Sequence, residues 1–193
     1  TLVAAVQPDG ALFSSDFRAP ERLFALLMQA SGRAGRDADY VAAQGSRSEM
    51  WLQTFHPEHA IVAALRQHDY PAFAAQQLDE RQGAAMPPFA FQALVRADAR
   101  TQEVAQGFLR AASQAATDAA LPGLEHVTLY PPVPLTIQRV ANVERAQMLL
   151  ESDSRAALQR FLAAWQALLH HTRAQSAHKA LVRWLVDVDP LVI

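Results

Sequence analysis

The chain has 193 residues, of which 51% are hydrophobic, and a formal net charge of −2. This composition supports one or two small globular domains and excludes a polybasic protein that binds nucleic acid through bulk charge. The absence of cysteine excludes a disulfide scaffold and any site that needs thiolates, and it fits a cytoplasmic protein. No apolar run approaches the roughly 20 residues that a membrane-spanning helix needs, so we expect no membrane partner.

The first third of the sequence alternates between strand-like and helix-like patterns. Residues 2–6 and 50–55 are typical of strands, and helices are expected over 20–30, 56–67 and 70–82. Strands and helices that alternate at such short spacing predict an α/β layer with parallel strands. Because the sequence opens within a strand, we expect the chain to be a fragment of a longer protein.

A glycine and a double proline over residues 83–88 mark the expected boundary between two domains, 1–83 and 84–193. Beyond it, strands are expected over 89–97, 127–130, 146–151 and 181–188, and helices over 101–120 and 154–172. This β-α-β-β-α-β order predicts a small split-βαβ domain with two helices on one face of a sheet. We expect Trp51, Trp165 and Trp184 to lie in the two cores.

The segment that is most informative about chemistry is Gln29-Ala30-Ser31-Gly32-Arg33-Ala34-Gly35-Arg36. Its two arginines lie three residues apart on a turn that Gly32 and Gly35 loosen, and two guanidinium groups so close together favour an anion between them. The chain carries neither a G-x-G-x-x-G fingerprint nor a G-x-x-x-x-G-K-[ST] phosphate loop. It can therefore only contribute arginines to a nucleotide that is held elsewhere.

The pattern Q-x-x-G-R-x-G-R resembles motif VI of superfamily-two helicases, and the segments around it narrow the resemblance to one family. In chain order they are residues 9–14, 16–19, 21–22, 29–36, 52–54, 56–59, 69–73, 87–89, 132–134, 154–155 and 184–190. Together they closely resemble the PriA family of replication-restart helicases (primosomal protein N′). The resemblance extends over essentially the whole chain.

The resemblance implies a fragment of an ATP-dependent 3′-to-5′ DNA helicase that restarts stalled replication forks and initiates primosome assembly. Residues 1–83 would be the end of the second RecA-like helicase lobe, with motifs V and VI, and residues 84–193 the C-terminal domain. ATP and magnesium would be bound mainly by parts of the protein outside this sequence, as would the zinc of the family. The fragment alone would be inactive.

The resemblance also implies roles for single residues. Arg36 would be the arginine finger, which stabilises charge on the transferring phosphoryl group and can contribute about 10³–10⁵ in rate. The residues expected to act are Gln29, Arg33 and Arg36 in catalysis; Asp9, Gly32 and Gly35 in nucleotide binding; and Phe13, Ser14, Phe17 and Arg18 in a loop that couples nucleotide state to DNA.

In this family the C-terminal domain binds branched DNA and the acidic C-terminal tail of single-stranded DNA-binding protein, and the protein works with primosome proteins. Arg155 and Gln159 match positions associated with the tail pocket. They are neighbours at i and i+4 of the expected helix, and free backbone N–H groups in its first turn also favour a carboxylate. Residues 138–147 depart from the basic and aromatic stretch of the family, which puts a DNA-binding role for this loop in doubt.

Two other functions stay open at this point. Residues 84–193 could recruit partners as a non-catalytic DNA- or protein-binding module, or the chain could belong to another superfamily-two motor. We expect no metal site, because His56 and His59 have ligand-like spacing but no convincing third ligand. Asp187 and Asp189 lie on one face of the last strand and are interpreted as a polar strand exit.

Overall fold

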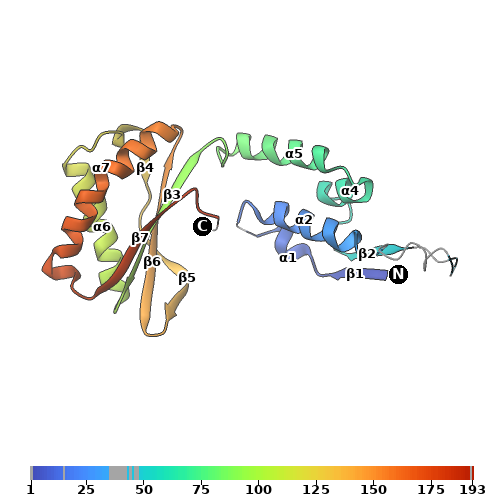
Figure 1. Cartoon of the computed structure of the whole chain (residues 1–193), viewed down its shortest axis with the longest axis horizontal. Coiled ribbons are helices and arrows are strands. Elements are labelled where there is room, and N and C mark those ends of the chain that lie inside the picture. Colours follow the sequence, from blue (N-terminus) through green and yellow to red (C-terminus); the bar gives the residue numbers. More distant parts are fainter. Residues whose placement is uncertain (1, 15, 35–42, 44, 46–47, 192) are drawn as a thin grey trace. The chain divides into compact units, whose positions relative to one another are not determined.

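The computed structural model describes residues 2–14, 16–34, 43, 45, 48–191 and 193. The chain forms two compact units, Thr1–Ala84 and Ala85–Ile193, and each contains helices and strands around its own hydrophobic core (Figure 1). The protein is thus of the mixed α/β class that the sequence predicts.

The first unit contains two parallel strands, β1 (Leu2–Val6) and β2 (Glu49–Gln53), and parallel pairing is what the alternating pattern predicts. The helices described in this unit are α1 (Asp9–Leu12), α2 (Ala19–Ser31), α4 (Ala60–Gln67) and α5 (Tyr70–Gly83). Two of these helices have a side-chain N-cap. His59 caps α4 by accepting a hydrogen bond from the Ile61 N–H, and Asp69 caps α5 by accepting one from the Ala72 N–H.

The core of the first unit lies between one face of the strands and the helices. Phe24 of α2 and Phe73 of α5 stack with ring centroids 4.2 Å apart. Met50 and Leu52 of β2 pack against this core. Trp51 lies between them in sequence and therefore points to the opposite face, where 61% of it is exposed and its indole N–H donates to Glu49. The prediction of a core position for Trp51 is wrong.

The second unit is an antiparallel sheet with two long helices. In chain order its elements are β3 (Phe91–Ala99), α6 (Gln102–Asp118), β4 (Val127–Leu129), β5 (Val133–Val140), β6 (Val143–Ser152), α7 (Arg155–Ala174) and β7 (Leu181–Val188), with short 3₁₀ turns at Leu124–His126 and Ser176–His178. The strand order is β4-β6-β3-β7, and β5 pairs with β6. Both helices lie on the same side of the sheet (Figure 1).

Strand β5 is absent from the predicted order, because prolines at 132 and 134 argue against a strand there. It forms nonetheless, pairing only with β6, and proline is tolerated on a strand that needs hydrogen bonds on one side. The turn that joins β5 to β6 is Ala141-Asn142, and both residues have positive φ angles, as tight hairpin turns require.

The two faces of this sheet differ in chemistry, which positions the site described below. Alternate residues of β3, such as Val95 and Ala97, are fully buried against Phe108 of α6 and Trp165 of α7. The Trp165 indole N–H donates to the Ala112 carbonyl at 2.9 Å. The opposite face carries ion pairs instead, for example Arg96 with Asp187 at 3.7 Å.

Candidate functional site

The end of α2 presents the side chains that the motif analysis singled out. Gln29 in its last turn and Arg33 just beyond it are both exposed. Gly32 ends the helix with a φ of −64°, a right-handed backbone open to any residue. A Cβ at this position would make only ordinary contacts, at 3.6 and 3.7 Å from backbone oxygens. This turn therefore does not use the conformational freedom of Gly32, which corrects that part of the sequence analysis.

Of the two motif arginines, Arg33 lies within the described residues. Within the described part of the chain, no carboxylate lies within ion-pairing distance of its guanidinium group. An arginine that a carboxylate already neutralises would be a poor phosphate ligand, and none of the described carboxylates pairs with Arg33. Gly35 and Arg36 lie outside the described residues, so the arginine-finger role of Arg36 stays a prediction.

Asp9, expected at a nucleotide, has two partners within its own unit. It begins α1 directly after β1, and its carboxylate accepts hydrogen bonds from the Phe55 N–H, at 3.0 Å, and from the Thr54 hydroxyl. These two hydrogen bonds, the one from Phe55 first, hold the pKa of Asp9 below its ordinary value. Asp9 thus ties the carboxyl end of β1 to that of β2, the edge of parallel strands where α/β proteins bind ligands.

The loop between α1 and α2 carries the four residues expected to couple nucleotide state to DNA. Phe13 is 63% exposed, with its ring centroid 4.7 Å from that of His56. Ser14 accepts a hydrogen bond from the Asp16 N–H at 3.2 Å. Phe17 is half-buried, and the guanidinium carbons of Arg18 and Arg81 each lie 5.1 Å from its ring centroid. Phe13 therefore has free surface for stacking, whereas Phe17 is already engaged.

Arg81 of α5 binds this loop to α5, and the sequence did not predict a role for Arg81. Its side chain is 14% exposed and donates to Glu21 at 2.9 Å and to the Phe17 carbonyl at 3.4 Å. Asp16 also holds the loop, because its carboxylate pairs with Arg22 and accepts a hydrogen bond from the Arg18 N–H. Burial raises the pKa of Asp16, but these two hydrogen bonds outweigh it, and the pKa lies below its ordinary value. Sixty residues separate Arg81 from Glu21, so no local pattern in the sequence indicates this contact.

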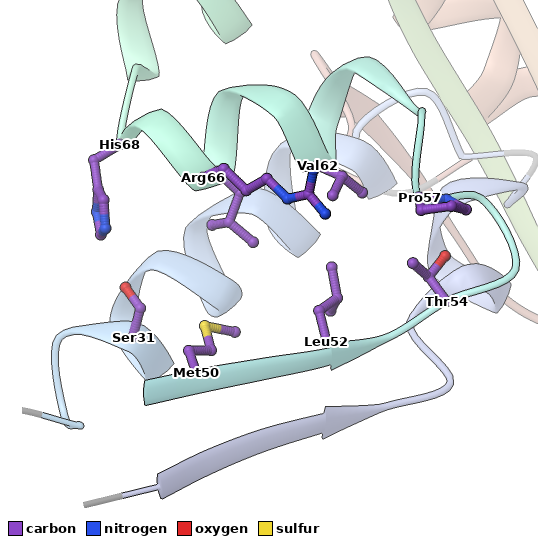
Figure 2. A pocket seen from close by; sticks show the side chains of 9 residues that line it. Ser31, Met50, Leu52, Thr54, Pro57, Val62, Arg66 and His68 are labelled. Carbon is purple, nitrogen blue, oxygen red and sulfur yellow. The ribbon is translucent and has the colours of Figure 1, made fainter. Parts of the chain in front are cut away.

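A pocket of about 400 Å³ opens between β2 and α4, beside the end of α2 (Figure 2). Its lining residues are Ser31, Met50, Leu52, Thr54, Pro57, Val62, Leu65, Arg66 and His68. Met50 and Leu52 rise from the strand toward Val62 and Arg66 on the helix above (Figure 2). The lining is apolar at its base and has a cation at its edge, which suits an apolar group with a negative charge.

Arg155 and Gln159 lie together at the start of α7, both exposed. The helix is capped by Ser154, whose hydroxyl accepts from the Ala157 N–H at 3.3 Å. The guanidinium carbon of Arg155 lies 4.9 Å from the centroid of the Phe91 ring, and its Nη2 lies 3.3 Å from Oδ2 of Asp189. The structure thus brings the two predicted partner-binding residues onto one surface and adds Phe91 and Asp189 to it.

The sequence gives only a partial signal for these additions. Asp187 and Asp189 were expected to share one surface, but each pairs with a different arginine: Asp187 with Arg96 and Asp189 with Arg155. Residues 138–147 form the hairpin of β5 and β6, where Arg139 pairs with Glu144 at 3.6 Å. Nothing in the local sequence around residue 155 indicates that residues near 91 and 189 lie beside it.

Two further findings concern other kinds of site. Among the described residues, no three histidine or acidic side chains are grouped so that they could hold a metal ion. No helix in the same part of the chain combines the length and apolar character needed to cross a membrane.

Residues 82–191 match the family model described as the primosomal protein N C-terminal domain. The chain is 38% identical to the replication restart protein PriA of Haemophilus influenzae over 190 residues, which are 98% of this chain and 24% of that protein. The PriA of Synechocystis is 30% identical over 193 residues, 100% of this chain and 21% of the relative. The PriA of Bacillus subtilis is 35% identical over 95 residues, 49% of this chain and 11% of the relative.

The chain thus spans about a quarter, or less, of the length of these curated relatives. The matched family model covers more than half of the chain. These matches confirm the resemblance carried by the motifs: the chain belongs to the PriA family of replication restart proteins and contains its primosomal protein N C-terminal domain.

Proposed function

We propose that this chain is the C-terminal part of a replication restart helicase. Residues 1–83 would be the end of the second RecA-like lobe, with motifs V and VI, and residues 84–193 a C-terminal domain of the split-βαβ type. The parallel β1–β2 pair supports the first assignment. The β4-β6-β3-β7 order with two helices on one side supports the second. The complete protein would use ATP to unwind DNA in the 3′-to-5′ direction and would initiate primosome assembly at stalled forks.

One observation carries the motor role: Arg33 is exposed at the end of α2, with no carboxylate of the described residues beside it. Gln29 lies one helical turn earlier, so both can meet a triphosphate that another lobe supplies. The chain's own groups would then stabilise charge on the γ-phosphate, while ATP and magnesium would be bound mainly by parts outside this chain. Asp9 would support this edge by fixing the ends of β1 and β2.

The test is DNA-stimulated ATP hydrolysis by the complete protein. We expect Arg33→Ala and Arg36→Ala each to lower the rate by about 10²-fold or more, in line with the worth of arginines that stabilise phosphoryl transfer. Arg110→Ala is the matched control, since Arg110 is also an exposed helix arginine but lies on α6 of the second unit, outside the motif. Near-normal hydrolysis by both motif variants would refute the motor role of this segment.

The second unit would bind partners. Arg155 and Gln159 would receive the acidic C-terminal tail of single-stranded DNA-binding protein, and the unit would also contribute to binding branched DNA and primosome proteins. An exposed guanidinium group over Phe91, beside the first turn of a helix, is suited to a carboxylate next to an apolar side chain.

A non-catalytic binding module is the second candidate function, because residues 85–193 have a core of their own. In the complete protein, Arg155→Glu separates the two candidates. A combined motor and binding protein loses tail binding in this variant and keeps its ATP hydrolysis. A binding module alone shows no effect of Arg33→Ala on any activity.

A further inference from the structure

The arginine proposed to receive a partner's carboxylate already holds a carboxylate of its own chain. Arg155 Nη2 lies 3.3 Å from Asp189 Oδ2, and the same guanidinium group lies over Phe91. The Arg155 and Asp189 side chains are 62% and 46% exposed, so the pair sits in solvent. A partner carboxylate and Asp189 would therefore compete for the same donor atoms.

The surroundings of Asp189 allow its side chain to leave while its backbone stays in place. It follows the end of β7, and its N–H donates to the Gln92 carbonyl at 2.9 Å, which holds the main chain next to β3. Pro190 comes next and is buried. Rotation of the Asp189 carboxylate into solvent thus requires no change in the sheet.

Phe91 keeps its position during such an exchange. It begins β3 and packs partly against the core of the second unit. Its ring faces the Arg155 guanidinium group at a distance that permits a cation–π interaction. The ring therefore orients Arg155 whether Asp189 or another carboxylate is bound.

We propose that Asp189 is an internal competitor at this site: it occupies Arg155 in the absence of a partner, and an acidic partner segment binds by displacing it while Arg155 stays on Phe91. This inference rests on the proposed tail-binding role of Arg155. It assigns to Asp189 the control of affinity for that class of ligand.

The size of the effect follows from the exposure of the pair. Ion pairs in solvent are worth up to about 1 kcal/mol and weaken as salt is added. Removal of the competing charge should tighten partner binding about two- to fivefold at low ionic strength. The gain should shrink toward zero at high salt.

The experiment measures binding of a fluorescent synthetic peptide, with several acidic residues and an apolar residue at its C-terminus, to the 193-residue chain by anisotropy. Asp189→Asn is compared with Asp187→Asn, which removes the same charge from the same segment but faces Arg96. Arg155→Gln tests the site itself. We expect tighter binding for Asp189→Asn, little change for Asp187→Asn and loss of about tenfold or more for Arg155→Gln.

The outcomes separate this inference from the proposed function. If Arg155→Gln weakens binding but Asp189→Asn does not strengthen it, Asp189 is no competitor, and the tail-binding role stands. Equal gains for Asp189→Asn and Asp187→Asn would indicate bulk charge and would also overturn the inference. If Arg155→Gln binds like the unmodified chain, the tail-binding role fails and the competitor role fails with it.

Discussion

Two helix ends in this protein each expose an arginine, and they differ in what that arginine already contacts. At the end of α2, Arg33 has no carboxylate among the described residues. At the start of α7, Arg155 lies over Phe91 and pairs with Asp189. Among the described residues, the first arrangement leaves the Arg33 guanidinium group open to a ligand. The second provides a weak internal substitute, so a ligand must compete for the site.

The difference indicates that exposure alone does not define the role of an arginine. A group that stabilises developing charge should not be neutralised beforehand, because its contribution comes from charge left uncompensated until the reaction proceeds. A group that binds a flexible acidic segment tolerates a competitor, which sets the affinity. The following variants test this contrast.

The largest effect is expected from Gln29→Glu, which places a carboxylate in the last turn of α2, four residues before Arg33. It makes the end of α2 resemble the start of α7. We expect ATP hydrolysis by the complete protein to fall at least about tenfold below that of Gln29→Ala. If the two variants have equal rates, a carboxylate placed next to Arg33 does not affect hydrolysis.

The attachment of the coupling loop gives the next effect. Arg81→Gln removes the bonds to Glu21 and the Phe17 carbonyl, and we expect a loss of about 1–2 kcal/mol in the free energy of unfolding. Urea denaturation measures it. Arg110→Gln on α6, an exposed helix arginine, serves as control and should lie within about 0.5 kcal/mol of the unmodified chain.

A smaller effect is expected at Phe91. Phe91→Leu keeps an apolar side chain but removes the ring beneath Arg155. A cation–π contact in solvent is worth about 0.5–1 kcal/mol, so the acidic peptide should bind about two- to fivefold more weakly. Unchanged affinity in a chain that still loses binding with Arg155→Gln would show that the ring does not orient the arginine.

Asp9 gives the smallest effect, and it depends on pH. Its pKa in the folded chain is lower than the ordinary 3.8, so the stability it contributes is present above that value and is lost as pH falls through the folded pKa. Asp9→Asn should therefore have a lower Tm than the unmodified chain at pH 7. As the pH falls below 3.8, the Tm of the unmodified chain should fall more than the Tm of the variant. If the Tm of both proteins falls equally with pH in acid, the ionised Asp9 carboxylate does not stabilise the link between β1 and β2.

The sequence was a good guide where the signal is periodic or local. The i, i+3, i+4 pattern locates α7, and alternating apolar residues locate β3. The prolines near 133 argued against a strand, so β5 was not predicted. Proline is tolerated there because β5 pairs only with β6, and the sequence alone does not show that a strand has a single neighbour. Trp51 was misplaced because a large aromatic side chain suggests burial, whereas its face of the strand is set by Met50 and Leu52.

The sites divide in the same way. The spacing of Gln29, Arg33 and Arg36 is readable in the sequence, and so are Arg155 and Gln159. Their surroundings are not, because Asp9 meets Thr54 across 45 residues and Arg81 meets Phe17 across 64. Whether an arginine is paired depends on such distant contacts, so the pairing of Arg155 with Asp189 becomes known only from the structure.

The most direct test of the central claim is the affinity of the complete protein, with and without Arg33→Ala, for ADP alone and for ADP with aluminium fluoride, a mimic of the transferring phosphoryl group. If Arg33 meets the developing charge on the transferring group, the variant binds ADP normally but loses about tenfold or more in affinity for the mimic. Equal affinity of both proteins for the mimic would contradict that account.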